Sequence, residues 1–217
     1  MFRLAVLASG SGTNLQAVID KLHGRLAGVG GPVIEVALVI SDNPDAQALE
    51  RAREADIPAA VFPIDHGGSR AEHDLIMAAA IRKAEAELVV LAGYMRMVSP
   101  AFIQEFPFRV INLHPAILPA FPGTTSISDA LRYGVKVTGV TVHFVDEGLD
   151  TGPVIAQEPV RVNDGDTVES LAARIHEVEH QLLPATIRLI AMGKIRAPLP
   201  GTRVVQVDWS SDDSSDT

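Results

Sequence analysis

The sequence predicts an α/β protein with a single-domain, Rossmann-like, mostly parallel sheet, helices on both of its faces and a short antiparallel C-terminal extension. Apolar strand-like runs alternate with helical patterns through the first 115 residues, which is typical of a parallel sheet with crossover helices. The run at 136–145 instead alternates apolar and polar residues, as expected of an antiparallel strand. A chain of 217 residues is long enough to bury one core of this size.

The first half of the chain supplies the parallel strands. Apolar runs predict these strands at Leu4–Ala8, Glu35–Ile40, Val61–Phe62, Leu88–Ala92 and Val110–Leu113. Helix signals separate them. A first helix is expected over Leu15–Leu22, and Asn43-Pro44 would cap and begin the next one. Ser69 and Glu72 have capping-box spacing for a helix that reaches about Ala84, and Ser99-Pro100 begins another.

The last third changes character. Lys136–Val145 predicts a half-exposed antiparallel strand with Val140, Val142 and Phe144 on one face. Asp166–Glu169 opens a final helix whose apolar stripe is Leu171, Ile175, Val178 and Leu182. Pro184 is expected to kink or interrupt this helix, because proline lacks the N–H of the helical ladder.

Composition limits the class of protein. The chain has no cysteine, which excludes disulfides and thiolate metal sites and favours a cytoplasmic protein. No apolar run is long enough for a membrane span or a signal peptide. The net charge of −9 argues against nucleic-acid binding. We expect a domain over residues 1–200 and a polar, acidic, disordered tail over residues 201–217.

The segment after the fifth strand carries the strongest chemical signal. Asn112 and His114 are two residues apart at the end of an apolar run, so their side chains share one face of the strand. Pro115 ends the regular ladder there. The carboxyl end of a strand is where open α/β sheets bind ligands. An amide and an imidazole at one point suit chemistry at a carbonyl, although a lone histidine at a strand end is more often structural.

A second segment favours a catalytic role for His114 over a purely structural one. The run from Thr138 leads into a turn that contains Asp146, Glu147 and Asp150. A carboxylate from such a loop can orient a distant histidine and raise its pKa, because the negative charge favours the imidazolium. The sequence does not establish that the two groups meet.

The N-terminal turn is a candidate anion site. Gly10-Ser11-Gly12-Thr13 follows a strand and precedes a helix, so its backbone N–H groups can surround a phosphate. The third glycine of a dinucleotide fingerprint is replaced by Leu15, and the lysine of a P-loop is absent. A single terminal phosphate therefore fits better than a pyrophosphate, and a plain strand-to-helix turn stays possible.

These motifs together resemble the 10-formyltetrahydrofolate-dependent formyltransferases. The resemblance rests on Asn112–Pro119, Leu149–Ile155 and Ala8–Gln16, in the family's order, and covers roughly residues 2–195. It implies transfer of a formyl group from 10-formyltetrahydrofolate to the primary amine of glycinamide ribonucleotide in purine biosynthesis. It implies no metal, and a homodimer by analogy alone.

The resemblance also assigns roles to residues. Asn112 and protonated His114 would stabilise the oxyanion, and Asp150 would keep His114 charged. The residues expected to bind the ribonucleotide are Gly10, Ser11, Gly12, Thr13, Asn14 and Glu179. Those expected to bind the folate are Arg70, Met95, Arg96, Met97, Val98 and Asn112. His143 is as consistent with a supporting role behind these groups as with a purely structural one.

One departure and three alternatives stand beside this interpretation. The family commonly carries a histidine and a basic residue after Pro122-Gly123, whereas this chain has the neutral run Thr124–Ser128. The alternatives are a 10-formyltetrahydrofolate hydrolase, a formyltransferase acting on another amine such as methionyl-tRNA, and a non-catalytic phosphosugar-binding protein. The acidic chain lacks an evident tRNA-binding appendage, and only the neutral run favours a non-catalytic protein.

Overall fold

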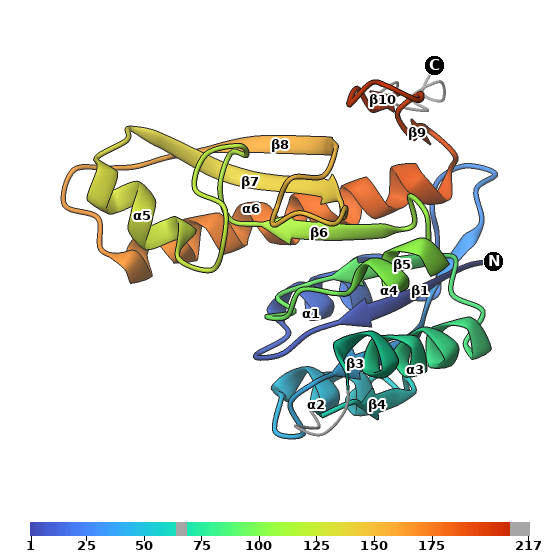
Figure 1. Cartoon of the computed structure of the whole chain (residues 1–217). Coiled ribbons are helices and arrows are strands. Elements are labelled where there is room, and N and C mark those ends of the chain that lie inside the picture. The colour runs from blue at the N-terminus through green and yellow to red at the C-terminus, as the bar shows by residue number, and fades with distance from the viewer. Residues whose placement is uncertain (64–68, 209–217) are drawn as a thin grey trace, which may run out of the picture.

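The computed structural model describes residues 1–63 and 69–208 of the chain (Figure 1). A parallel block is built from β1 (Phe2–Leu7), β3 (Val33–Ser41), β4 (Ala59–Val61), β5 (Leu88–Leu91) and β6 (Val110–His114). Antiparallel strands extend it at both sides: β2 (Arg25–Leu26) pairs with β3, and β7 (Val137–Phe144) with β8 (Val154–Arg161) follow β6. The strand order is β2-β3-β1-β5-β6-β7-β8, with β4 also on β3.

Helices cover both faces of the sheet, as predicted. Alternate residues of β1 divide between two apolar clusters: Leu4 and Val6 face one, Ala5 and Leu7 the other. The first cluster includes buried residues of α1 (Thr13–Leu22), α2 (Gln47–Glu54) and α6 (Val168–Ala191). The second includes α3 (Arg70–Lys83) and α4 (Pro100–Glu105). Figure 1 shows α6 running along the β6–β8 side of the sheet.

Several predicted element starts are confirmed by their caps. Ser69 and Glu72 form the expected capping box of α3, and the Ser99 hydroxyl accepts from the Phe102 N–H at the start of α4. Asn43-Pro44 does not cap α2, which begins at Gln47. The Asn43 side chain instead accepts from Asp45 N at 3.0 Å, so this pair makes a turn before the helix. The short third parallel strand lies at Ala59–Val61 rather than at Val61–Phe62.

The predicted exposure of residues 136–145 is wrong, although the antiparallel pairing is right. Strand β7 is buried on both faces from Thr138 to Phe144. The segment after β6 lies against it: the Leu118 N–H donates to Thr141 Oγ1 at 3.1 Å, and that hydroxyl donates to the Ala116 carbonyl at 2.7 Å. Helix α5 (Ser126–Tyr133) and the edge strand β8 were not predicted from the sequence.

Pro184 does not interrupt the last helix, which was one of the two expected effects of this residue. Helix α6 begins after Thr167, whose side chain caps the helix by accepting from the Ser170 N–H. It continues through Pro184 to Ala191. Proline cannot donate to the carbonyl of His180, four residues earlier. The Lys21 ammonium group of α1 donates to this carbonyl at 2.7 Å, so the acceptor is satisfied from a neighbouring helix.

The described C-terminal segment includes a small antiparallel pair, β9 (Ile195–Arg196) with β10 (Gln206–Val207). The paired strand β10 lies within the range expected to be a disordered tail, so the predicted tail begins too early. Residues 209–217, the rest of that tail, lie outside the described residues. In the described part of the chain, no helix is long and apolar enough to cross a membrane.

Candidate active site

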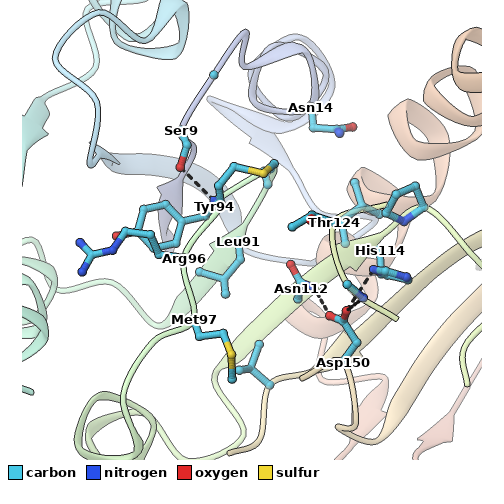
Figure 2. Close-up of a pocket in the computed structure, with 18 of the residues that line it drawn as sticks. Ser9, Asn14, Leu91, Tyr94, Arg96, Met97, Asn112, His114, Thr124 and Asp150 are labelled. Carbon is cyan, nitrogen blue, oxygen red and sulfur yellow. Dashed lines mark hydrogen bonds and ion pairs between the residues drawn. The ribbon is translucent and has the colours of Figure 1, made fainter. Parts of the chain in front are cut away.

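Asn112 and His114 lie on one face at the carboxyl end of β6, and Asp150 joins them from the loop between β7 and β8 (Figure 2). The Asn112 amide Nδ2 lies 3.3 Å from Asp150 Oδ1, and His114 Nδ1 lies 3.4 Å from Asp150 Oδ2. The His114 and Asp150 side chains are 4% and 10% exposed, so water screens their interaction weakly. The carboxylate therefore meets both predicted catalytic groups.

The position of Asp150 depends on its loop. Its backbone adopts a left-handed conformation with φ of 53°, which aspartate tolerates better than most residues. The Gly123 N–H donates to Asp150 Oδ2 at 2.8 Å. Burial alone would raise the pKa of Asp150, but contacts with His143, Gly123 and His114 outweigh it and lower the pKa. Asp150 is therefore ionised at neutral pH.

His143 supports this cluster from the neighbouring strand. It is the register partner of Asn112 in the β6–β7 ladder, and its Nε2 lies 3.2 Å from Asn112 Nδ2. The His143 Nδ1–H donates to the Phe144 carbonyl at 2.9 Å, so in the neutral ring Nε2 is an acceptor. Both N–H bonds of the Asn112 amide are then directed at protein partners, His143 and Asp150.

Asp150 acts on His114 in the expected direction, but burial has the larger effect on its pKa. Burial lowers the pKa of His114 and exceeds the opposing effect of Asp150, which raises it. His114 Nε2 lies 2.8 Å from the Phe121 carbonyl, which can only accept, so Nε2 carries a proton. The proton that titrates therefore belongs to Nδ1, the atom that faces Asp150.

The N-terminal turn forms a tight strand-to-helix connection, as predicted. Gly12 is the N-cap of α1 with φ of 68°, and no side chain caps the helix. The first-turn N–H groups therefore lack partners within the helix and are available to an anion. A Cβ at Gly12 would come within 2.8 Å of Ala48, and the Ala48 N–H donates to the Gly10 carbonyl at 3.1 Å. Helix α2 thus lies directly behind this turn.

Glu179 and Asn14 meet although 165 residues separate them. Asn14 Nδ2 donates to Glu179 Oε2 at 2.8 Å, and Glu179 is 4% exposed. His176 Nδ1 reaches the same oxygen at 2.8 Å, which raises the pKa of His176. His176 is exposed, and its spacing of three residues from Glu179 puts both side chains on one face of α6.

The Tyr94–Val98 turn forms another side of the pocket. The Met95 N–H donates to Ser9 Oγ at 2.9 Å, and Met95 and Met97 are exposed. Arg96 lines the pocket, but Figure 2 shows its guanidinium pointing away from Asn112 and His114. Arg70 is exposed at the start of α3 and is not among the lining residues, so the structure does not bring it to this pocket.

The neutral run at Thr124–Ser128 continues into a helix. Thr125 is the N-cap of α5, and its hydroxyl donates to Asp129 Oδ2 at 2.8 Å. Ser128 Oγ donates to the Thr125 carbonyl at 2.8 Å. These hydroxyls are used within the first turn of α5, and Thr124 alone of this run lines the pocket.

These elements enclose one pocket of about 450 Å³. It contains Asn112, His114 and Asp150, together with the N-terminal turn, Glu179 and the Met95–Val98 wall. Ser9, His143 and His176 line it as well and were not among the predicted site residues. Among residues 1–63 and 69–208, no group of three or more His, Asp or Glu side chains could hold a metal ion.

A parallel α/β sheet that presents an amide, an imidazole and a carboxylate beside an anion-binding turn is the architecture of a group-transfer enzyme. The chain belongs to the formyl transferase family, which it matches over residues 2–187. As a member of this family it is a formyltransferase.

Relatives of known name agree with this assignment. The chain is 39% identical to phosphoribosylglycinamide formyltransferase of Bacillus subtilis over 87% of this chain and 94% of that protein. It is 46% identical to the protein of the same name from Mycobacterium tuberculosis, over 87% and 85% of the two chains. The crystal structure of glycinamide ribonucleotide transformylase 1 from Symbiobacterium toebii superposes with a TM-score of 0.88 at 46% identity, covering 95% of this chain and 94% of that one.

Proposed function

We propose that this protein transfers the formyl group of 10-formyltetrahydrofolate to the primary amine of glycinamide ribonucleotide, yielding formylglycinamide ribonucleotide and tetrahydrofolate. The observation that carries the proposal is the placement of the Asn112–His114–Asp150 cluster in the same pocket as the Gly10–Thr13 turn. The turn suits the phosphate of the ribonucleotide, and the cluster suits chemistry at the formyl carbon. The cysteine-free composition supports a cytoplasmic location.

The two substrates would occupy different sides of the pocket. The ribonucleotide phosphate binds at the N-terminus of α1, and Asn14 and Glu179 lie farther along the same side to receive the sugar and glycinamide portion. The folate ring lies against the Met95–Val98 wall, whose exposed methionine side chains offer apolar contacts. This arrangement brings the amine and the formyl group together at Asn112 and His114.

In the proposed reaction, the amine nitrogen forms a bond to the formyl carbon and the carbonyl oxygen becomes negatively charged. Donors from Asn112 and His114 stabilise this oxygen, and each such donor contributes about 10²–10³ in rate in comparable sites. The bond from carbon to N10 then breaks, N10 gains a proton and the amine nitrogen loses one. Because Asn112 and His114 donate to Asp150, His143 and Phe121 in the structure, the substrate oxygen must displace at least one of these acceptors.

Asp150 has a defined part in the proton movement. Its carboxylate lies beside Nδ1 of His114, and the negative charge of the carboxylate favours protonation of that atom. Burial lowers the pKa of His114, and a neutral imidazole with an adjacent carboxylate can accept a proton from the attacking amine. The same proton is then available to N10.

The test is an assay of the purified protein with both substrates, in which the absorbance of the deformylated folate is monitored. A control reaction contains no ribonucleotide. Turnover that requires the ribonucleotide is the expected result. Loss of the formyl group without ribonucleotide would instead identify a hydrolase. Absence of turnover in both reactions, with binding of both compounds retained, would overturn the proposal in favour of another amine acceptor or a binding protein.

A further inference from the structure

The pocket presents an electrostatic difficulty for a phosphate. Among the described residues that line it, Arg96 is the only lysine or arginine, and its guanidinium points away from the catalytic cluster (Figure 2). Three carboxylates, Asp146, Asp150 and Glu179, line the same pocket. A phosphate carries close to two negative charges at neutral pH, so these carboxylates repel it, and a cation that acts on the turn from outside the pocket would add to the attraction from Arg96 and His176.

Such a cation lies behind the turn. Arg51 is half-buried on α2, the helix that packs against Gly12 through Ala48. Its Nε donates to the Ser11 carbonyl at 2.8 Å, and its Nη1 donates to Gln16 Oε1 at 3.1 Å. The guanidinium thus bridges the turn to the second turn of α1.

The contact with Ser11 has a directional consequence. In a trans peptide the carbonyl and the next N–H point in opposite directions, so a donor that fixes the Ser11 carbonyl also fixes the Gly12 N–H. That N–H then points away from Arg51. The positive guanidinium also increases the polarisation of this peptide, which makes the N–H a stronger donor to an anion.

We propose that Arg51 is the positioning residue of the phosphate site: it orients the Ser11–Gly12 peptide and adds a positive charge directly behind the turn. This inference rests on the proposed function for the identity of the ligand, a sugar phosphate. Arg51 acts through the Ser11 peptide and does not itself need to touch the substrate.

Arg53 provides a matched control on the same helix. It lies two residues from Arg51, its side chain is 62% exposed, and its guanidinium pairs with Glu50 rather than with the turn. Replacing either arginine by glutamine removes one positive charge from α2. Only the Arg51 substitution removes a contact with the phosphate turn.

The experiment measures Kd for ribose 5-phosphate and for ribose by calorimetry with the intact protein and with Arg51→Gln, Arg51→Lys and Arg53→Gln. Because no turnover is involved, the result does not depend on whether formyl transfer takes place. We expect Arg51→Gln to weaken ribose 5-phosphate binding about tenfold, the effect of one charge-assisted contact. We expect the Kd of the Arg51→Lys variant to lie between those of the Arg51→Gln variant and the unsubstituted protein. Arg53→Gln should change Kd less than twofold.

Kinetics with the full substrate provide the second readout. Arg51→Gln should raise KM for glycinamide ribonucleotide about tenfold while kcat and the KM for the folate change less than twofold. The dephosphorylated substrate, glycinamide riboside, should show the same KM in both proteins. An equal loss with the ribonucleotide and the riboside, or equal effects of Arg51→Gln and Arg53→Gln, would overturn the proposal, because either result indicates a general structural or charge effect.

Discussion

Asn112 and His143 face each other across the β6–β7 ladder, and the histidine determines how the amide is oriented. His143 donates through Nδ1 to the Phe144 carbonyl, so in the neutral ring Nε2 is the acceptor for Asn112 Nδ2, which lies 3.2 Å away. The nitrogen end of the amide is therefore directed toward His143 and Asp150. A substrate oxygen that replaces one of these acceptors meets a donor whose direction is already fixed.

Removal of either predicted oxyanion donor should reduce turnover strongly. We expect Asn112→Ala or His114→Ala to lower kcat by about 10²-fold or more, because each donor acts mainly on the transition state. The Kd for the ribonucleotide should change little, because its phosphate binds at the other end of the pocket. Steady-state kinetics together with calorimetry measure both quantities. Near-normal kcat in either variant would contradict the assignment.

The substitution Asp150→Asn tests the coupling between the carboxylate and the imidazole. Asparagine tolerates the left-handed backbone of this position, so the loop should keep its conformation. Asp150 raises the pKa of His114 against the effect of burial, and its loss should move that pKa further down. NMR titration of the imidazole measures the shift, and kcat should fall by about 10²-fold. An unchanged imidazole pKa would show that the two groups are not coupled.

Two glycines of the anion turn should respond differently to alanine. At Gly12 the left-handed backbone and the approach of Ala48 both oppose a Cβ, so Gly12→Ala should cost about 2 kcal/mol or more of unfolding free energy. At Gly10 a Cβ would meet nothing within 4 Å, so Gly10→Ala should be close to neutral. Urea denaturation of both variants makes the comparison, and equal costs would show that the close packing of α2 is unimportant.

Lys21 and Pro184 form a pair that a double-mutant cycle can test. Lys21→Met should destabilise the protein by about 1 kcal/mol, because the His180 carbonyl loses its donor. Pro184→Ala restores a backbone N–H to that carbonyl, so the cost of Lys21→Met should largely disappear in the double variant. Additive costs in urea denaturation would mean that Lys21 does not replace the missing N–H.

Stability should fall as the pH is lowered. The pKa of His114 in the folded protein lies below its ordinary value of 6.5, so below about pH 6.5 the unfolded chain gains a proton that the folded protein does not. The lowered pKa of Asp150 adds stability that is present above pH 3.8 and is lost as the pH falls through its folded value. Unfolding free energies from about pH 7.5 to about pH 5 measure the first effect, and His114→Asn should make that profile flatter.

The parallel half of the fold could be predicted because its signals are local. Short apolar runs mark the strands, and Ser69 and Ser99 mark helix starts through bonds within four residues. The exposure of β7 could not be inferred, because the segment that covers it folds back from the end of β6. The donor that satisfies the His180 carbonyl in place of residue 184 could not be inferred either, because Lys21 lies on another helix far away in the sequence.

The candidate site was predictable in its residue types and less so in its contacts. Asn112 and His114 are identified by strand spacing, and a nearby motif supplies Asp150. His143 and Ser9 could not be assigned with confidence, because their roles depend on cross-strand register and on Met95 from another loop. The lowered pKa of His114 could not be inferred, because the sequence does not reveal that the side chain is almost fully buried.

The bond between Asn14 and Glu179 has a consequence for synthesis on the ribosome. Helix α1 leaves the ribosome early, but α6, which covers its apolar face and completes the pocket, is among the last long elements made. A nascent chain that has folded its parallel strands therefore still lacks the α6 part of the apolar cluster that contains Leu15, Val18 and Leu22. Its substrate site is assembled only after nearly the whole domain has been translated, so chains arrested before α6 should be inactive and prone to aggregate.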